Sequence, residues 1–372
     1  MRRSIWALIL AGGRGVDMYP LVDDGEPKYL LNILGKPLIK YPVDAMRDLG
    51  IRRVMIASNR VLMRDDEVET TRYGENETDA IREIAQHSLR GTTVIIAYGD
   101  VVMPVEAYKL LLDSHLGSGR SLTAMVVPME DTAGYVRINV TETQEIGGAS
   151  RSSDHQPGYV LAGALAVEGD YLVDIMRGEF IELLGNSKGN AAMWSGWWID
   201  VKYPWDVLSV IRNVMNSWTE GRISAKASVS SKASIEGVVF IDDGATVDHN
   251  ATIRGPAYIG RKAYVGTNAL IRNYAAIEEG CVVGAGAEIT ESSIQPFSTV
   301  GRGSFIGSSI MGSQGVMEPG VVTLTAHQDG AKIGDRKLGA LIGRRARIGA
   351  NSVMSPGTVV EPGKVVPPLS RL

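Results

Sequence analysis

The sequence predicts an α/β domain with a mostly parallel sheet, followed by a parallel β-helix. Before about residue 220, short apolar segments alternate with segments of helical spacing, and such alternation requires crossover connections between strands. From residue 223 on, aliphatic residues recur at every sixth position, a period that fits neither an α-helix nor a hairpin sheet. We therefore divide the chain into one domain at 1–221 and a second at 222–372.

The strands expected in the first domain are short runs rich in Ile, Val and Leu. They are Ile5–Leu10, Arg53–Ala57, Thr93–Ala97 and Leu122–Val127. Helical spacing of apolar residues marks Pro37–Leu49 and Thr78–Leu89, and a helix over 204–218 closes the domain after Pro204. These elements together predict a Rossmann-like sheet with flanking helices.

The second domain is built on a hexapeptide repeat. Its aliphatic positions are Ile223, Val229, Ile235, Ile241, Val247, Ile253, Ile259, Val265, Ile271, Ile277, Val283 and Ile289. We expect these side chains to point inward and stack from coil to coil, while a small residue four positions later allows the tight corner. The register breaks at 290–299 and 312–340, and the longer break is either a functional loop or a plain surface loop.

Length, charge and cysteine content restrict the size, the partners and the compartment that we expect for this protein. The chain has 372 residues, 44% of them hydrophobic, which is enough material for two or three domains. A net charge of −4 disfavours nucleic acid or an anionic membrane as the partner, since both need basic patches. Cys281 is the single cysteine and has no intrachain disulfide partner, so we expect a cytoplasmic protein. No apolar stretch approaches the roughly 20 residues that span a bilayer.

A glycine-rich turn follows the first expected strand. Backbone N–H groups approach a phosphate closely only where no Cβ intervenes, so this turn is a candidate nucleotide site. The residues concerned are Leu10, Ala11, Gly12, Gly13, Arg14 and Gly15.

The stretch around this turn resembles the sugar-1-phosphate nucleotidylyltransferase family. After the turn come Pro20-Leu21, then Pro27-Lys28-Tyr29-Leu30-Leu31, then Gly35-Lys36-Pro37-Leu38-Ile39, which follow the family's motifs L-A-G-G-x-G-T-R-L-x-P-L, P-K-x-L-x-P-I and G-K-P-L-I. With its hexapeptide tail, the chain resembles the archaeal bifunctional nucleotidylyltransferase/acetyltransferases and the bacterial N-acetylglucosamine-1-phosphate uridylyltransferases over nearly its whole length. For the tail, the resemblance implies a left-handed β-helix and assembly as a homotrimer or higher oligomer.

The resemblance also implies a reaction and its residues. A sugar-1-phosphate attacks the α-phosphorus of a nucleoside triphosphate, and pyrophosphate leaves. Asp100, in Tyr98-Gly99-Asp100, and Asp200, in Trp198-Ile199-Asp200-Val201, are the implied ligands of Mg²⁺. Lys28 and Arg14 are the implied catalytic cations, and both also belong to the nucleotide site. Gly163 lies where the family contacts the sugar, and Asn76 is assigned to the nucleotide.

The sequence departs from the family at several positions. Asp17 replaces an arginine that meets the triphosphate, and the family's E-K-P segment has no match, with Arg151 as a candidate substitute. In the tail, Phe297 stands where bifunctional relatives carry the histidine base of acetyl transfer. His327 and Asp329 occupy the next acetyltransferase loop.

Two main hypotheses remain open. The chain is either an active nucleotidyltransferase without acetyltransferase activity, or a weak or inactive nucleotide-binding subunit that regulates an active homologue. Asp17 and the missing E-K-P segment favour the second, whereas Lys28, Asp100 and Asp200 favour the first. Acyl transfer by the β-helix is a third hypothesis, which Phe297 disfavours. The sequence identifies neither the base nor the sugar.

Overall fold

The computed structural model describes residues 4–13, 15–22, 26–60, 68–85, 89–175, 180–325, 332–333 and 336–372. The chain forms two compact units, 1–13 with 38–200 and 14–37 with 201–372. The division into domains at 1–221 and 222–372 stays a prediction.

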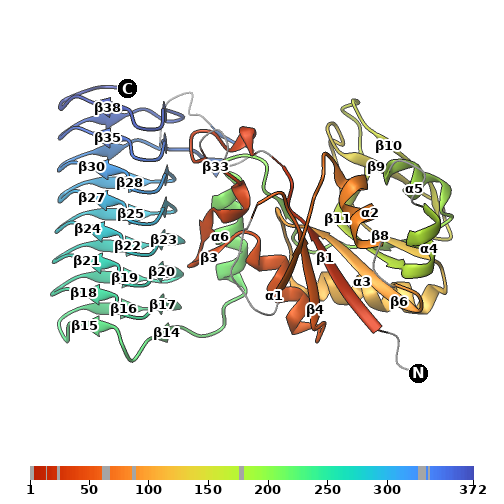
Figure 1. Ribbon diagram of the computed structural model, residues 1–372. Coiled ribbons are helices and arrows are strands. Elements are labelled where there is room, and N and C mark those ends of the chain that lie inside the picture. Colours follow the sequence, from red (N-terminus) through yellow and green to blue (C-terminus); the bar gives the residue numbers. More distant parts are fainter. Residues whose placement is uncertain are drawn as a thin grey trace. The chain divides into compact units, whose positions relative to one another are not determined.

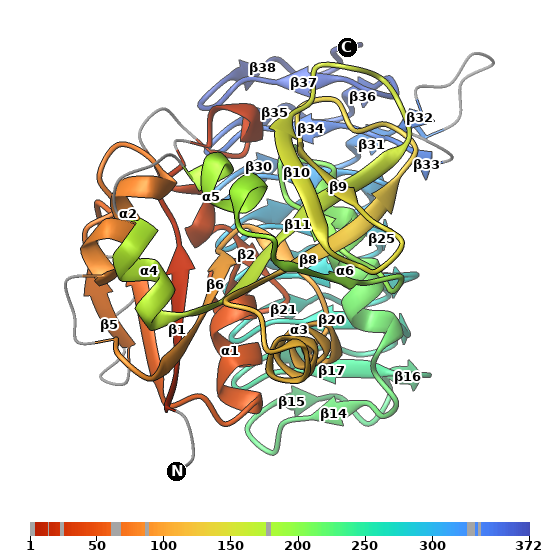
Figure 2. The same ribbon diagram turned by 90° about the vertical axis from the view of Figure 1, so that its right-hand side faces the viewer.

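The first unit contains a nine-stranded sheet (Figure 1). Its strands are β1 (Ser4–Leu10), β4 (Arg53–Ala57), β5 (Val68–Thr71), β6 (Thr92–Tyr98), β8 (Leu122–Met129), β9 (Val136–Val140), β10 (Ile146–Arg151), β11 (Gly158–Glu168) and β12 (Asn190–Met193). The main path runs β10-β9-β11-β6-β1-β4-β5, and β8 pairs with β11 and β12. Figure 2 shows the β9–β10 hairpin at the edge of this sheet. All four strands predicted from the sequence are confirmed.

The centre of this sheet is parallel, because β1 pairs in parallel with β4 on one side and with β6 on the other. β11 then runs antiparallel to β6 and makes the sheet mixed. Ala7, Leu8 and Ile9 are all fully buried, as expected of a central strand covered on both faces. The predicted fold class is confirmed.

Helices and one short strand pair complete the first unit. The helices are α1 (Lys40–Asp48), α2 (Glu77–Ala85), α3 (Val105–Ser118), α4 (Gly169–Ile175) and α5 (Phe180–Asn186). The helices predicted at 37–49 and 78–89 are confirmed as α1 and α2, although α1 begins only at Lys40 and residues 86–88 lie outside the described residues. β7 (Val101–Val102) pairs antiparallel with β13 (Ile199–Asp200) outside the main sheet.

The second unit contains a β-helix of three all-parallel sheets. The first sheet holds β14 (Arg222–Ile223), β17 (Val239–Ile241), β20 (Ala257–Ile259), β23 (Ala275–Ile277), β26 (Ser293–Ile294), β29 (Ile310–Met311), β34 (Leu341–Ile342) and β37 (Val359–Val360). The second holds β15 (Ser228–Val229), β18 (Thr246–Val247), β21 (Tyr264–Val265), β24 (Val282–Val283), β27 (Thr299–Val300), β30 (Val316–Met317), β35 (Arg347–Ile348) and β38 (Val365–Val366). The third holds β16 (Ser234–Glu236), β19 (Thr252–Arg254), β22 (Leu270–Arg272), β25 (Glu288–Thr290), β28 (Phe305–Gly307), β31 (Val322–Thr323) and β36 (Val353–Met354).

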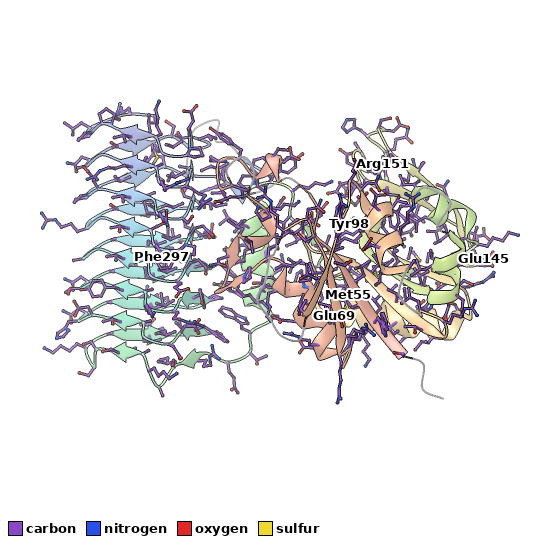
Figure 3. The ribbon with its side chains drawn as sticks, viewed as in Figure 1. Met55, Glu69, Tyr98, Glu145, Arg151 and Phe297 are labelled. Carbon is purple, nitrogen blue, oxygen red and sulfur yellow. The ribbon has the colours of Figure 1, made fainter. Side chains whose placement is uncertain are left out.

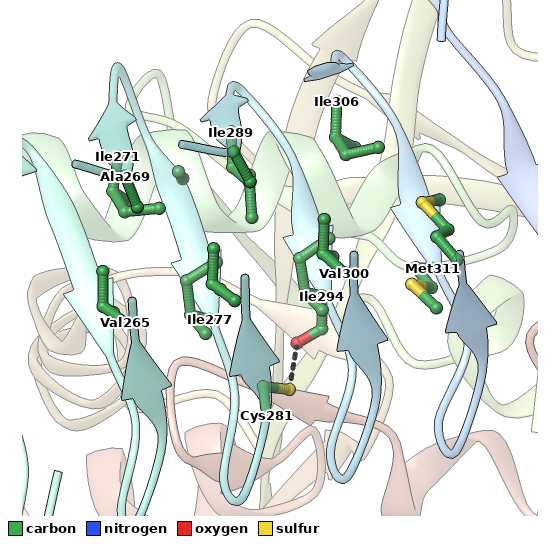
Figure 4. Packing of buried hydrophobic residues seen from close by; sticks show 14 of the residues in the cluster. Val265, Ala269, Ile271, Ile277, Cys281, Ile289, Ile294, Val300, Ile306 and Met311 are labelled. Carbon is green, nitrogen blue, oxygen red and sulfur yellow. Dashed lines mark hydrogen bonds between the residues drawn. The ribbon is translucent and has the colours of Figure 1, made fainter. Parts of the chain in front are cut away.

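The predicted hexapeptide positions fill the interior of this β-helix. Ile271 pairs in register with Ile289 one coil later, and both are fully buried (Figure 4). Ile223, in the first coil, is 50% exposed, since no earlier coil covers it. Cys281 takes one of the small corner positions and its Sγ donates to the carbonyl oxygen of Gln295 at 3.1 Å. Burial raises the pKa of this thiol to about 12, so it stays protonated as a core residue.

The two register breaks differ from the prediction. At the first break the chain simply omits one residue, and Ile294 takes the inward position between Ile289 and Val300. The second break begins later than predicted, because Met311 and Met317 continue the buried column and Thr323 is buried beside it. The insertion therefore lies after β31, where it includes a hairpin of β32 (Lys332–Ile333) and β33 (Arg336–Lys337).

The second unit also contains residues 14–37 and the helix α6 (Asp206–Asn216). The 14–37 segment holds two short 3₁₀ helices, η1 (Val16–Met18) and η2 (Lys28–Leu30), and a hairpin of β2 (Asn32–Ile33) and β3 (Lys36–Pro37). Val207, Val210 and Ile211 line the buried face of α6, which confirms the helix predicted over 204–218. Among the described helices, none is long and apolar enough to cross a membrane.

Candidate active site

The glycine turn lies at the carboxyl edge of the central parallel strands. After β1 ends, the Ala11 amide donates to the carbonyl oxygen of Ala57 at 2.9 Å, and the Gly99 amide donates to that of Leu10 at 2.8 Å. The end of β1 and the start of the turn are thus hydrogen-bonded to the carboxyl ends of both neighbouring strands, β4 and β6. In open α/β sheets this edge is where ligands bind.

Gly12 is needed in this turn because an aromatic ring covers it. A Cβ on Gly12 would lie 2.0 Å from the ring of Tyr73, which real side chains never approach. Burial raises the pKa of the Tyr73 phenol, and the carboxylates of Glu77 and Asp100 raise it further. Tyr73 is therefore a neutral phenol close to the glycine turn.

Asp100 and Asp200 come from adjacent positions of one strand pair. Asp200 on β13 pairs with Val101 on β7, and Asp100 directly precedes Val101. Both carboxylates are half-buried. Mg²⁺ is usually held by one or two carboxylates together with substrate phosphates, and the assignment of this pair to the ion stays a prediction. Within the described ranges, no group of three or more His, Cys, Asp or Glu side chains is arranged around a metal position.

Tyr98 lies between the carboxyl edge of the sheet and Asp100 in the chain. It is the last residue of β6, two positions before Asp100. Burial raises the pKa of the Tyr98 phenol far above its ordinary value, nearby acidic groups raise it further, and Arg151 opposes that shift. The guanidinium of Arg151, at the end of β10, therefore acts on the same region (Figure 3).

Gly163 sits at an irregularity in β11. Its φ of +74° interrupts the pairing of β11 with β8 between Leu161 and Leu165. A Cβ at this position would lie 2.7 Å from Cγ2 of Val101, so glycine lets β11 approach the strand that follows Asp100. The indole Nε1 of Trp198 donates to the carbonyl oxygen of Ala162 at 2.8 Å. Trp198 thereby connects Gly163 with the strand that carries Asp200.

Asn76 has a structural role in the first unit. Its side-chain oxygen accepts a hydrogen bond from the Asp79 amide at 3.1 Å, which is the pattern of an N-cap at the start of α2. Its assignment to the nucleotide stays a prediction.

Lys28 and Gly15 meet in the second unit. A Cβ on Gly15, whose φ is +70°, would lie 3.1 Å from Cβ of Lys28. Lys28 is only 8% exposed, and its Nζ donates to the carbonyl oxygen of Val201 at 3.0 Å. Val201 directly follows Asp200 in the chain. Asp17 is exposed on η1.

Three predicted residues lie outside the described residues, namely Arg14, His327 and Asp329. Phe297 is described and is 58% exposed. It occupies a β-helix corner with φ +61°, and its ring covers Gly280 of the preceding coil.

Comparison with known proteins finds two similarities. Residues 7–165 match the MobA-like NTP transferase domain. This part of the chain is therefore similar to a nucleotidyltransferase domain. It is also similar to a probable mannose-1-phosphate guanylyltransferase 2 of Oryza sativa subsp. japonica, with 23% identity over 239 residues. That match covers 57% of this chain and 65% of the relative, so the chain spans somewhat less than two thirds of the relative's length. The resemblance predicted from the motifs is confirmed.

Sequence reasoning missed several residues near these groups. Tyr73 reaches the candidate site only through the folding of distant segments, and no motif distinguishes it from a core aromatic residue. Trp198 lies in the motif that contains Asp200, but the motif gave it no role. Asp206 was missed as well. Its Oδ2 accepts the amides of Lys202 and Tyr203 at 3.0 and 2.7 Å, which fixes the loop that receives Lys28.

Proposed function

We propose that this protein transfers a nucleotidyl group from a nucleoside triphosphate to a sugar-1-phosphate and releases pyrophosphate. The observation that carries the proposal is the adjacency of Asp100 and Asp200 on one strand pair, in a unit whose glycine turn lies at the ligand-binding edge. The match of residues 7–165 to the MobA-like NTP transferase domain, which includes the glycine turn and Asp100, supports it.

The reaction needs no protein nucleophile, because the sugar phosphate itself attacks the α-phosphorus in line. Positioning and charge neutralisation then supply the rate. Mg²⁺ held by Asp100 and Asp200 would neutralise the reacting phosphates and align them. The backbone amides of Gly12 and Gly13 bind the triphosphate, and the segment at Gly163 contacts the sugar.

Cationic side chains complete the proposed site. Lys28 acts as a point charge on the phosphates, together with Arg14. We assign to Arg151 the contact with the sugar phosphate that the absent E-K-P segment makes in the family, since its charge acts on Tyr98 beside Asp100.

A second candidate function is a regulatory subunit that binds nucleotide without turnover. Asp17 favours it, because a carboxylate near the triphosphate repels the substrate. We further propose that the tail has no acetyltransferase activity, since Phe297 accepts no proton. In this proposal the β-helix mediates a homotrimer or higher oligomer in the cytoplasm, with an active homologue as the partner in the regulatory case.

The test is pyrophosphate release by the purified protein with Mg²⁺ and a matrix of nucleoside triphosphates against hexose- and hexosamine-1-phosphates. GTP with mannose-1-phosphate comes first, because the rice relative is named for that pair. Release that Asp100→Ala abolishes supports the enzyme. Silence across the matrix with nucleotide still bound supports the regulatory subunit.

A further inference from the structure

The segment that carries Lys28 is attached to the β-helix at separate points. Two residues before Lys28, Glu26 forms an ion pair with Arg344 of the β-helix. Four residues after it, the carbonyl oxygen of Asn32 accepts a hydrogen bond from Nε2 of Gln295 at 2.8 Å. The anchors thus lie on both sides of the lysine.

The strongest anchor is Glu278, which lies on the β-helix directly after β23 and is fully buried. Its Oε1 accepts the amide of Leu34 at 2.7 Å, and its Oε2 accepts the amide of Gly35 at 2.8 Å. Leu34 and Gly35 form the two-residue turn between β2 and β3, and both have positive φ, 54° and 80°. One carboxylate therefore caps both amides of a turn whose first residue is in an unfavourable conformation.

The Tyr258 side chain lies close against this turn. A Cβ on Gly35 would lie 2.0 Å from the hydroxyl oxygen of Tyr258, whose hydroxyl donates to Asp242 at 2.6 Å. Gln295 is equally fixed, because its Nε2 also donates to the Ser293 hydroxyl at 2.9 Å and the side chain is 1% exposed.

These polar anchors act beside apolar burial, because Tyr29 and Ile33 of the segment are buried as well. Beside the segment lies a cavity of about 370 Å³, lined by Leu30 and Leu31 on one side and by Gln295, Phe297 and Arg344 on the other. The polar contacts therefore add to apolar packing in holding the segment.

We infer that the β-helix positions the lysine of its own chain: Glu278 and Gln295 are positioning residues that fix the β2–β3 hairpin and, through it, Lys28. This inference rests on the proposed function for the role of Lys28 in turnover, but the anchoring itself does not. It gives the repeat domain a task within one chain, separate from assembly.

Glu278→Gln tests the inference. The glutamine side chain keeps the shape of glutamate, but its NH₂ group is a donor and cannot accept a hydrogen bond from the backbone N–H that it faces. Glu279→Gln is the matched control, a neighbouring half-buried glutamate with the same change of charge. We expect Glu278→Gln to lower kcat at least tenfold, with KM changed less than about threefold, while Glu279→Gln leaves both unchanged. Above the folded pKa of about 7, where Glu278 is ionised, amide hydrogen exchange in residues 28–37 should become at least tenfold faster in Glu278→Gln only.

A double-mutant cycle separates positioning from general damage. If Glu278 acts through Lys28, Glu278→Gln has less than a twofold effect on kcat when Lys28 is already alanine. The same loss in both backgrounds would overturn the inference. If Glu278→Gln does not fold, Gln295→Met removes the donor to Asn32, and we expect about threefold effects in the same measurements.

The exchange measurement also distinguishes this inference from the proposed function. A wild-type protein without turnover contradicts the proposed enzyme, and hydrogen exchange alone then decides the anchoring. Exchange in 28–37 that is unchanged by Glu278→Gln overturns it, whatever the activity.

Discussion

The nine-stranded sheet and the β-helix are both built on parallel strands, but they bring residues together differently. In the β-helix, Ile253 pairs with Ile271, the equivalent residue of the next coil. In the sheet, Trp6 pairs with Arg53 across a crossover, and nothing in the sequence repeats between them. Structure in the β-helix thus follows from a local period, whereas the candidate site depends on unique long-range pairings. Substitutions should therefore act on stability in one region and on chemistry in the other.

The largest effect is expected at the carboxylate pair. Asp200→Asn keeps the size of the side chain but removes the charge next to Val101, and we expect pyrophosphate release to fall by about 10³-fold or more. Thermal stability should change little. Asp113→Asn, an exposed carboxylate on α3, is the control and should retain full activity. Equal activity of the two variants would remove Asp200 from the site.

Shortening an inward-facing side chain of the β-helix should destabilise the protein more in an inner coil than in the first coil. Ile271→Ala leaves a cavity in the stacked interior, and we expect a loss of about 3–4 kcal/mol in the free energy of unfolding. Ile223→Ala changes the same hexapeptide position in the first coil, where the side chain is 50% exposed, and should cost less than about 1 kcal/mol. Denaturant unfolding measures both. Similar losses at the two positions would show that the coils do not differ in burial.

Glu278 should make stability depend on pH. Its pKa is raised from 4.5 to about 7, mainly because the side chain is buried; the Gly35 and Leu34 amides oppose this shift and the nearby Asp242 carboxylate adds to it. Tyr258, through its bond to Asp242, and the Cys281 thiol also belong to its surroundings.

The direction of this pH dependence follows from the proton that Glu278 binds in the folded protein. Between about pH 4.5 and 7 the folded protein keeps a proton on Glu278 that the unfolded chain releases, so stability falls as pH rises. The loss is on the order of 3 kcal/mol and is complete above the folded pKa. Urea unfolding across this range should show it in the wild type and not in Glu278→Gln. Parallel pH profiles for the two proteins would contradict the assignment.

A smaller effect is expected at the glycine turn. Gly12→Ala forces the Tyr73 ring to move, and we expect KM for the nucleotide to rise roughly tenfold. Gly12→Ala combined with Tyr73→Ala should recover most of the loss. Gly117→Ala is the control, because a Cβ there meets nothing within 4 Å. A double variant no better than Gly12→Ala alone would mean that the backbone, and not the ring, requires glycine.

The fold could be predicted largely from the sequence, because hexapeptide positions and strand–helix alternation are local signals. Where the hexapeptide period weakened, the prediction was wrong in detail. Met311 and Met317 continue the row of buried side chains inside the β-helix, but Met311 follows Ile306 after five residues, and Met replaces the usual Ile or Val at both positions. In the candidate site, motifs pointed to Asp100 and Asp200, which the β7–β13 pair brings together. The role of Glu278 could not be predicted from the sequence. It is a glutamate within the repeats, and it becomes a buried hydrogen-bond acceptor only because the β2–β3 hairpin packs against it.

The most direct test of the account is a Mg²⁺ titration of pyrophosphate release by wild type, Asp100→Asn and Asp113→Asn, with the best substrate pair from the matrix. We expect no release without Mg²⁺, saturation in wild type and in Asp113→Asn, and almost none in Asp100→Asn at any Mg²⁺ concentration. Release by Asp100→Asn with the wild-type Mg²⁺ dependence would contradict the assignment of Asp100 and Asp200 as the metal site.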